Sequence, residues 1–525
     1  LTQARFYADA LLESNVVKPH ICINPSLAQP LLCLPPRQPG LAPDFPKGKS
    51  LTGFMKMSFY LYRRREAEKT PLYQVVHKHL PAFLQRGETS GHRLPGFVRN
   101  ELEAFLRCGI LSHGFARFEC KRCRHNHVVA FSCKGRGFCP SCGGRRMTGR
   151  AAHLVDAVLP NVPVRQWVLT LPVRLRYLIA YDAKLCSEIL NAFISEIFRW
   201  HRRSAKRHAG LESMAQARCG SLTFIQRAGS ALNLNVHFHS LVLDGIYVHR
   251  AWNAPLRFVA LPSPANADIE ATLCRVKKRI IKILARHGHA SPDDEPFNDF
   301  AECEPLLAAC VTDSLTHQNA LQGEKKPEQI LDAPPAPLCA SEDYYSLHAN
   351  TRIRSGERKR LEKLCRYVAR PPVSNALVVE LGDGSIAYKL KRPWQDGTTA
   401  LVFKPFELLA RLASLVPPPR VHQVRYHGVL ASASALREFV VPAGPRQKQT
   451  RTRKNYCWAE LMQRAFEIDV LQCPRCAGTM RFVASIMQRD AIVAILGSMG
   501  LPADSPTSVP ASDFGFVEDS KWQAA

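Results

Sequence analysis

The middle of the chain combines two spacings of hydrophobic residues, one typical of strands and one typical of helices. The two patterns predict a strand, a helix, two strands and a helix, over residues 166–171, 182–208, 221–226, 236–243 and 269–287. We expect Asp268 to cap the start of the last helix and Gly288 to end it. This order predicts an antiparallel sheet with helices on one face, in the ferredoxin-like manner.

The segments on either side of this core carry weaker patterns. Residues 72–109 predict two or three short helices, interrupted at Pro81. Residues 289–353 are read as an insertion or linker, because an acidic start is followed by a proline-rich middle. A basic helix is predicted at 356–370, then a strand hairpin, and the chain beyond residue 403 is read as mainly helical.

The charge of the chain points to a class of partner. The 525 residues include 71 Lys and Arg against 44 Asp and Glu, a formal net charge of +27. Such an excess is typical of proteins that bind a polyanion, with nucleic acid as the first candidate and an anionic membrane surface as the second. No apolar run reaches the roughly 18 residues expected of a membrane-spanning helix, and we expect no secretory signal. Residues 1–54 are proline-rich and read as a poorly ordered leader, with Met55 or Met57 as an alternative start.

A group of cysteines before residue 150 could bind a metal ion. Cys120 and Cys123 form one Cys-x-x-Cys pair, and Cys139 and Cys142 form a second. Two such pairs predict a structural zinc site with four thiolate ligands, in a reducing compartment. Other nearby residues could replace one of these ligands: Cys133, His125 and His127. Reduced cysteines without metal are the alternative.

A third Cys-x-x-Cys pair, Cys473 and Cys476, lies far from the others in sequence. A pair supplies only two ligands, and Cys457 is the one further cysteine that we consider for this site. A second zinc knuckle and plain reduced cysteines are equally good interpretations.

His237 and His239 flank Phe238 inside a predicted strand. Because side chains alternate along a strand, the two imidazoles point to one face and Phe238 points to the other. Two adjacent imidazoles can hold one divalent metal ion, although an ordinary pair of strand histidines has the same spacing. Gln226, on the preceding strand, is our first choice as a third ligand, and Asn235, on the histidine face, is the second.

Tyr367 lies near the end of the basic helix predicted at 356–370. The apolar residues Leu361, Leu364 and Val368 can face the sheet, which leaves Tyr367 among arginines and lysines. A tyrosine in such a setting can attack a phosphodiester as an oxygen nucleophile. Packing at the edge of the helix is the alternative.

Taken together, these motifs resemble a known family. The histidine–hydrophobe–histidine motif and the downstream tyrosine are similar to those of HUH endonucleases. Longer stretches are similar, more narrowly, to rolling-circle transposases of the insertion-sequence-ninety-one type. These stretches are Phe115–Cys120, Phe131–Cys142, Leu222–Arg227, Asn233–His239, Arg366–Pro372 and Val416–Gly428, and the likeness covers roughly residues 70–490.

The resemblance implies an enzyme that nicks one DNA strand, joins its 5′ end to a tyrosine and frees a 3′ hydroxyl. His237 and His239 match the family's metal pair, for Mg²⁺ or Mn²⁺, and Tyr367 matches the nucleophile. Some members carry two tyrosines four residues apart, but this chain has Lys363 at that position, so it resembles the single-tyrosine branch. Tyr426 is a backup nucleophile in a segment that the family shares.

The resemblance also sets expectations for partners. We expect single-stranded DNA at the element ends, a homodimer as one option, no membrane, and a cytoplasmic, nucleoid-associated location in a bacterium. The expected DNA contacts are Arg145, Arg146, Arg366, Arg370 and Arg425. Two other functions are weighed against the transposase: a zinc-dependent DNA-binding regulator without catalysis, and a metal-dependent nuclease that uses water.

The predicted fold class is α+β. N-terminal helices and a zinc-ribbon-like module precede a ferredoxin-like HUH catalytic domain, and a mainly helical C-terminal region follows. The predicted boundaries are a leader at 1–54, a zinc-binding and DNA-contacting domain at 70–150, a catalytic domain at 160–400 with an insertion at about 289–353, a C-terminal transposase region at 401–490 and a tail at 491–525.

Overall fold

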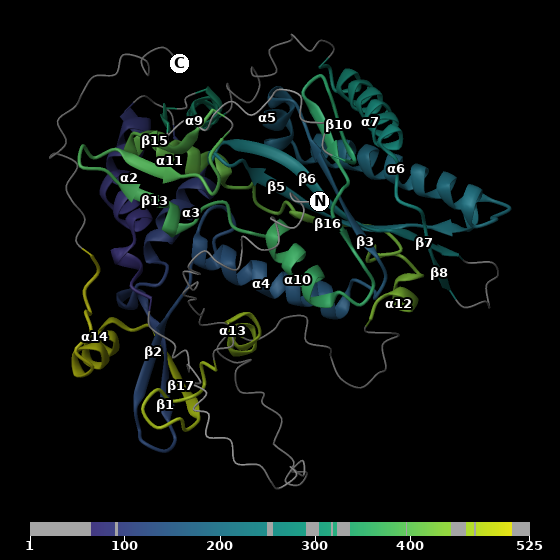
Figure 1. Cartoon of the computed structure of the whole chain (residues 1–525). Helices are drawn as coiled ribbons and strands as arrows, with labels where there is room; N and C mark the ends of the chain where they lie inside the picture. The colour runs from purple at the N-terminus through teal and green to yellow at the C-terminus, as the bar shows by residue number, and fades with distance from the viewer. Residues whose placement is uncertain are drawn as a thin grey trace, which may run out of the picture.

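A computed structural model gives the fold of the chain (Figure 1). The structure describes residues 65–89, 93–248, 256–289, 304–316, 319–322, 337–394, 396–442, 458–466 and 469–506. The expected leader, Cys457 and the tail after residue 506 lie outside these ranges. Among the described residues, no helix is long and apolar enough to cross a membrane.

An antiparallel sheet at the centre of the molecule confirms the α+β class and the expected strand order. Four of its strands follow one another as β11, β3, β6 and β5 across the sheet, which is the ferredoxin-like arrangement 4-1-3-2. β10 and β16 extend the two edges, and β12 pairs with the end of β3. The bounds are β3 Val164–Thr170, β5 Gly220–Ala228, β6 Leu234–Leu243, β10 Cys339–Glu342, β11 Tyr345–His348, β12 Arg352–Ile353 and β16 Val424–Gly428.

Helices cover both faces of this sheet, not only one as the sequence pattern predicted. On one face α6 (Ala183–His208) and α7 (Asn266–Arg286) pack on a core that includes Trp167 and Phe238. On the other face α4 (Pro140–Ala157) and α10 (Arg358–Val368) pack on a second core that includes Leu241. The strand period explains the division, because Phe238 and Leu241 stand an odd number of residues apart.

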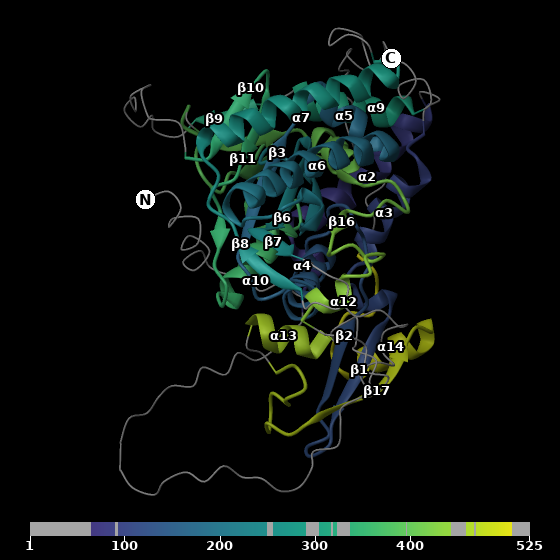
Figure 2. The same cartoon turned by 90° about the vertical axis from the view of Figure 1, so that its right-hand side faces the viewer.

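The N-terminal region is built from α2 (Pro71–Thr89), α3 (Gly96–Arg107) and a small three-stranded sheet. Its hairpin consists of β1 (Phe115–Cys120) and β2 (Asn126–Ala130), and its third strand is β17 (Met480–Ile486), from the far end of the described chain. Figure 2 shows this sheet extending away from the central body, with α13 (Trp458–Phe466) and α14 (Arg489–Ser498) close to it.

A four-stranded sheet of order β13-β14-β15-β9 and a short sheet of order β4-β7-β8 complete the strands. The remaining bounds are α5 Val173–Tyr181, α9 Pro305–Thr316, α11 Pro405–Leu415, α12 Arg437–Val440, β4 Ala217–Arg218, β7 Gly245–Val248, β8 Arg257–Ala260, β9 Asn319–Gln322, β13 Val378–Glu380, β14 Ile386–Lys389 and β15 Thr398–Phe403.

Two expectations about helix boundaries need correction, at Pro81 and Asp268, and the expectation that Gly288 ends the helix is confirmed. Helix α2 runs through Pro81 without a break. Helix α7 begins at Asn266, so Asp268 lies inside its first turn, where its carboxylate accepts a hydrogen bond from the Ala265 N–H at 3.0 Å. Gly288 follows the helix end with φ of +82°, a left-handed conformation that glycine adopts freely.

The predicted linker and the predicted helical C-terminal region both supply strands. Within 289–353, β10, β11 and β12 join the central sheet, because β11 pairs with β3 through Leu347 and Leu169. Beyond residue 403, β16 pairs with β5 and β17 pairs with β1. The C-terminal region therefore completes sheets that begin earlier in the chain.

Candidate functional site

The two histidines of β6 face α10 from the middle of the central sheet. Their ring centroids are 4.8 Å apart. His237 lies opposite Gln226 of β5 and Thr170 of β3, while His239 lies opposite Val168 of β3. Phe238 points to the opposite face and stacks on Phe193 of α6. The strand period therefore places the two imidazoles side by side, as the sequence predicted.

Each imidazole has a polar partner at Nδ1. The Nδ1–H of His237 donates to the Asn235 carbonyl at 2.7 Å, which leaves Nε2 with its lone pair. Nδ1 of His239 lies 2.7 Å from the side-chain amide of buried Gln166. A half-turn of that amide exchanges its nitrogen for its oxygen. With the oxygen toward His239, Nδ1–H donates and Nε2 is a metal-competent lone pair.

Burial keeps both imidazoles neutral. It lowers the pKa of His237 to about 4, with the nearby Arg176 and Arg370 adding to the effect. Burial also holds the pKa of His239 well below the usual value, helped by His237 and Arg370. A neutral imidazole is the protonation state that coordinates metal, and burial gives both rings that state near neutral pH.

Tyr367 stands beside these rings, near the end of α10. Its ring centroid is 6.3 Å from that of His239, in an edge-to-face arrangement. The guanidinium carbon of Arg370 lies 4.5 Å from the centre of the tyrosine ring. The end of α10 is tied to the sheet by the side chain of Gln226, which donates to the Val368 carbonyl at 2.5 Å. The helix end and the histidines therefore form one site.

The two choices for a third oxygen ligand have different surroundings. Gln226 already uses its amide nitrogen to hold the end of α10. Oδ1 of Asn235 is buried and has no hydrogen-bond partner among the described residues. An unpaired buried acceptor costs free energy unless a donor or a cation reaches it. This orphaned oxygen on the histidine strand is an observation that fits a bound divalent cation.

The cysteines do not assemble as the sequence predicted. The two expected pairs separate, so that Cys120 and Cys123 lie in one cluster and Cys139 and Cys142 in another. We call the inner cluster the four residues Cys108, Cys133, Cys139 and Cys142, and the outer cluster the four residues Cys120, Cys123, Cys473 and Cys476. The alternative ligands His125 and His127 belong to neither cluster.

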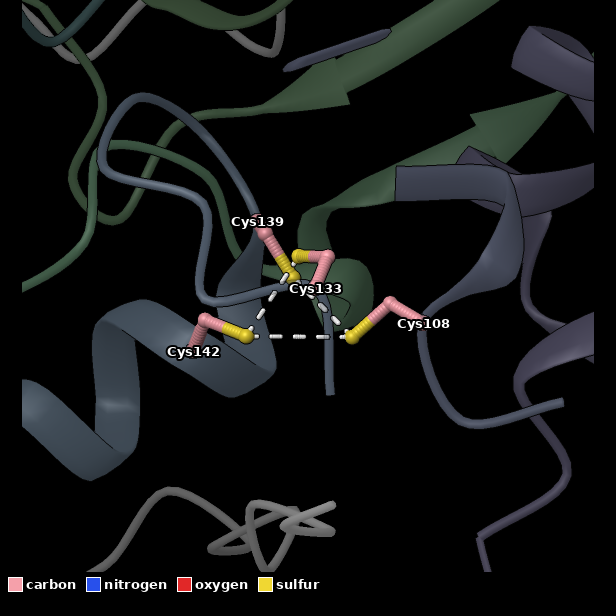
Figure 3. Close-up of side chains that lie close together, drawn as sticks. All are labelled: Cys108, Cys133, Cys139 and Cys142. Carbon is pink, nitrogen blue, oxygen red and sulfur yellow. Dashed lines mark hydrogen bonds between the residues drawn. The ribbon is translucent and has the colours of Figure 1, made fainter. Parts of the chain in front are cut away.

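The inner cluster has the dimensions of a four-thiolate metal site (Figure 3). Cys142 Sγ lies 3.8 Å from Cys108 Sγ and 3.4 Å from Cys133 Sγ, and Cys139 Sγ lies 3.7 Å from Cys108 Sγ. Tetrahedral zinc with Zn–S bonds of about 2.3 Å places its sulfurs roughly 3.8 Å apart. A disulfide would need about 2.05 Å, so these thiols are spaced for a metal ion.

Sequence reasoning missed the position of Cys108. It ends α3 as the C-cap residue, 31 residues before Cys139, with no second cysteine three residues away to mark it. Only the packing of α3 against the loop before α4 reveals its partners. Cys133 was recognised as an alternative ligand, and it does lie in the inner cluster.

A basic cavity of about 340 Å³ lies between α4 and β16. Its lining includes Arg136, Arg150, Arg420, His153 and Tyr426, and no Asp or Glu. Burial, and then the charges of nearby arginines, lowers the pKa of Arg150 to about 10. Arg145 and Arg146, two of the expected DNA contacts, also lie on α4, but the sequence did not show that residues from α4 and β16 share one cavity.

The arginines expected to contact DNA lie in different settings. Arg146 donates to the carbonyls of Gly135 and Lys134, both at 3.0 Å, and thereby braces the loop before α4. Arg366 is 2.5 Å from the Glu362 carboxylate. The guanidinium of Arg370 lies against the ring of Tyr367. Arg145 is half-buried on α4, and the guanidinium of Arg425 lies 3.4 Å from the Ser187 hydroxyl.

Tyr426 lies away from the histidines. It is opposite Leu222 on β5, whereas His239 is opposite Phe224 on the same strand. Two strand spacings and two residues along the strand correspond to roughly 12 Å between the backbones of Tyr426 and His239. The Arg437 guanidinium lies 5.5 Å from the tyrosine ring centre, and burial raises the pKa of Tyr426.

Comparison with known families agrees with this architecture. A family model described as "Transposase zinc-binding domain" matches residues 75–171, and one described as "Putative transposase" matches residues 220–437. A zinc-binding module followed by this sheet domain defines a DNA-processing enzyme of the transposase class. Both matches are to transposase families, and the zinc-binding one is the domain of insertion-sequence-ninety-one transposases. No curated protein and no solved structure shows a significant match.

The zinc-binding family and the cysteine geometry agree on a structural metal. All four cysteines of the inner cluster fall within the matched residues 75–171. Their residue type, number and spacing fit Zn²⁺, which prefers four thiolates in closed structural sites.

Proposed function

We propose that the chain nicks and transfers single DNA strands through a 5′-phosphotyrosine intermediate at Tyr367. The hydroxyl oxygen of Tyr367 attacks the scissile phosphorus and loses its proton. A new O–P bond forms as the bond from phosphorus to the 3′ oxygen breaks, and that oxygen takes up a proton to leave as a 3′ hydroxyl. The phosphodiester energy is kept in the tyrosine ester, so a later 3′ hydroxyl can reverse the step.

The observation that carries this proposal is the position of Tyr367, with its ring centroid 6.3 Å from that of His239 and Arg370 against its face. A phosphate that lies between the tyrosine oxygen and the histidines would contact all three elements of the site. The cationic Arg370 can stabilise both the phenolate and the phosphate charge. Packing alone does not explain why a neutral histidine pair and an orphaned Asn235 oxygen face the same space.

His237 and His239 are the residues that would hold a divalent metal, Mg²⁺ or Mn²⁺, through Nε2. A bound divalent ion polarises the scissile phosphate and stabilises the leaving 3′ oxygen. Asn235 takes precedence over Gln226 as the third ligand, because the Asn235 Oδ1 is buried without a hydrogen-bond partner among the described residues. Gln226 then acts as a positioning residue that holds Tyr367 over the sheet.

We further propose that the basic cavity beside α4 binds the DNA backbone next to the site. Arg136 and Arg150 present positive charge without a carboxylate in the cavity lining. Tyr426 offers an aromatic face on which an unpaired base can stack. Tyr426 and the histidines lie on the same face of the sheet, so one single strand can reach both.

The test is a covalent protein–DNA band on a denaturing gel. The full chain is incubated with single-stranded terminus DNA and Mn²⁺ or Mg²⁺. The wild-type protein should form the band, and Tyr367→Phe should abolish it while still shifting DNA on a native gel. Tyr344→Phe is the matched control, because that tyrosine is 89% exposed and should leave the band intact.

Three results would contradict the proposal. Cutting without a covalent band, retained in Tyr367→Phe, would indicate a nuclease that uses water. DNA binding without any cutting would indicate a regulator. Loss of the band in Tyr426→Phe with retention in Tyr367→Phe would move the nucleophile to β16.

A single tyrosine restricts how two strands are exchanged. The residue one helical turn before Tyr367 is the exposed Lys363, which cannot act as a second nucleophile. We propose that the second strand is handled by another copy of the chain, in a homodimer, or by reuse of Tyr367. A mixture of tagged wild type and Tyr367→Phe distinguishes these routes, since only a dimer allows the variant to depress wild-type joining.

A further inference from the structure

The outer cluster lies where two distant parts of the chain meet. Cys120 is the last residue of β1 and Cys123 lies in the β1–β2 turn, whereas Cys473 and Cys476 precede β17. Cys120 Sγ is 3.5 Å from Cys476 Sγ, and Cys123 Sγ is 3.5 Å from Cys473 Sγ. All four sulfurs lie within 4.8 Å of one another, which matches the roughly 3.8 Å edge of a zinc–thiolate tetrahedron.

The two halves of the outer cluster have the same local backbone. In each, the residue after the second cysteine is left-handed: Arg124 has φ of 57° and Ala477 has φ of 56°. In each, the backbone N–H of that left-handed residue donates to the carbonyl of the first cysteine. The distance is 3.1 Å from Arg124 to Cys120 and 2.9 Å from Ala477 to Cys473. Two matching turns that aim paired sulfurs at one point are a preformed ligand cage.

The space around the sulfurs is also fitted to this arrangement. A side chain at Gly478 would place its Cβ 3.2 Å from Cys120 Sγ and 3.2 Å from Cys476 Sγ. The glycine therefore lets the C-terminal turn approach the hairpin closely. The backbone N–H of Lys121 donates to the Thr479 carbonyl at 3.1 Å and links the two turns directly.

We propose that the outer cluster binds a second zinc ion, which clasps the C-terminal turn to the N-terminal hairpin. Cys120 and Cys123 lie inside the matched zinc-binding region 75–171, but Cys473 and Cys476 lie outside both matched regions, so the zinc-binding family accounts for only half of this four-cysteine site. The metal joins residues that are 350 and 356 positions apart in the chain. Closing so long a loop carries a large entropic cost, which metal bonds can offset.

The clasp holds more than one strand. β17 pairs with β1 along its length, and Phe482 packs edge-on against Phe118 with ring centroids 5.8 Å apart. The same apolar cluster includes Met462 of α13. From α13, Arg464 donates to Asp156 of α4 at 2.9 Å, and it lies 2.7 Å from Glu362 of α10, the helix that carries Tyr367. The clasp thus anchors a segment that contacts the catalytic helix.

The inner and outer zinc sites should differ in access. Three of the four inner cysteines are buried, whereas Cys123 of the outer cluster is exposed and Cys476 is partly exposed. A chelator therefore reaches the outer ion first. Loss of that ion should free four thiols together, although they come from opposite ends of the described chain.

The experiment measures zinc and thiol protection in the full chain, without DNA. Wild-type protein should contain two zinc ions per chain, and Cys473→Ser/Cys476→Ser should contain one. Cys120→Ser/Cys123→Ser should also contain one, and combining all four changes should remove no further zinc. Cys274→Ser/Cys339→Ser changes two partly buried cysteines outside both clusters and should retain two ions.

Thiol labelling of the wild-type protein covers the case in which a variant fails to fold. Under mild chelation, alkylation followed by mass spectrometry should modify the four outer cysteines together while the inner four stay protected. A wild-type content of one ion, full zinc content in Cys473→Ser/Cys476→Ser, or labelling of Cys473 and Cys476 before any zinc is lost would overturn the clasp. None of these readouts depends on DNA cleavage, so they test the second zinc site independently of the proposed nicking activity.

Discussion

The histidine site and the cysteine clusters are assembled by opposite means. His237 and His239 are neighbours because they lie two residues apart on one strand, and the sheet register brings Gln226 and Gln166 to them. The cysteines meet only where loops and strand ends from distant segments converge. A sheet supplies rigid positions, whereas a thiolate cluster depends on a metal to fix its loops. Substitutions in the histidine site should therefore impair chemistry, and substitutions in the cysteine clusters should impair folding.

The strongest test of this contrast is Cys139→Ser in the inner cluster. Removing one thiolate from a closed structural site should weaken zinc binding and destabilise the module by several kcal/mol, because metal affinity is part of the folding free energy. Thermal unfolding and zinc content measure the effect. Cys219→Ala, at a buried cysteine outside both clusters, should cost only about 1 kcal/mol and lose no zinc. Equal losses of stability and zinc in Cys139→Ser and Cys219→Ala would contradict a structural metal site at the inner cluster.

His239→Ala should have the next largest effect, and it should fall on chemistry. Loss of one of two imidazole ligands should reduce adduct formation by about a thousandfold, which corresponds to several kcal/mol of transition-state stabilisation. Thermal unfolding and DNA binding should change little. His208→Ala, at an exposed histidine on α6, is the control. A variant that keeps its adduct would separate the histidine pair from the reaction.

Gln166→Leu should have an intermediate effect that reports on orientation. The variant removes the hydrogen bond to Nδ1 of His239. Loss of such a hydrogen-bond partner of a metal-binding histidine typically lowers metal affinity by roughly 10–100-fold. The Mn²⁺ concentration at half-maximal adduct formation should rise, while the rate at saturating Mn²⁺ should recover. Gln166→Glu keeps an acceptor oxygen and should restore the affinity. A fall in rate at every Mn²⁺ concentration would indicate general disruption instead.

The smallest expected effect is on the pH dependence of stability. In the unfolded chain His237 takes up a proton near pH 6.5, whereas burial lowers its folded-state pKa to about 4. The unfolded state therefore binds more protons as the pH falls below about 6.5, so the folded state loses stability between there and about pH 4. Between pH 7 and 5.5 this histidine should cost on the order of 1 kcal/mol.

Urea unfolding at these two pH values measures the slope. His237→Asn should reduce the difference, and His208→Asn should keep the wild-type difference. An unchanged slope in His237→Asn would mean that the imidazole is accessible to protons in the folded state.

Local patterns in the sequence predicted the elements that position the histidine site. The period-two alternation around Phe238 fixed which face the imidazoles share, and the helical spacing of Leu361, Leu364 and Val368 oriented α10 toward the sheet. These inferences need only the geometry of one element at a time. The same reasoning failed for Pro81, because tertiary packing maintains a helix that local propensity disfavours.

Segments without strong periodicity were the ones that the sequence left unassigned or misread. Residues 289–353 read as a linker, yet Leu347 in that stretch pairs with Leu169 in the central sheet. β16 and β17 were likewise read as part of a helical region. Short strands at sheet edges bury few residues, so their patterns are brief, and only the partner strand identifies them.

By itself, the sequence determined the chemistry available to this protein: thiolates in Cys-x-x-Cys pairs, imidazoles two apart on a strand, a tyrosine on a basic helix and an excess of positive charge. Only the tertiary structure decided the partners, because it separated Cys120 from Cys139 and brought Cys473 to the N-terminal hairpin. The physical reason is that residue spacing fixes geometry within one element, whereas contacts between distant segments depend on how the whole chain buries its apolar faces.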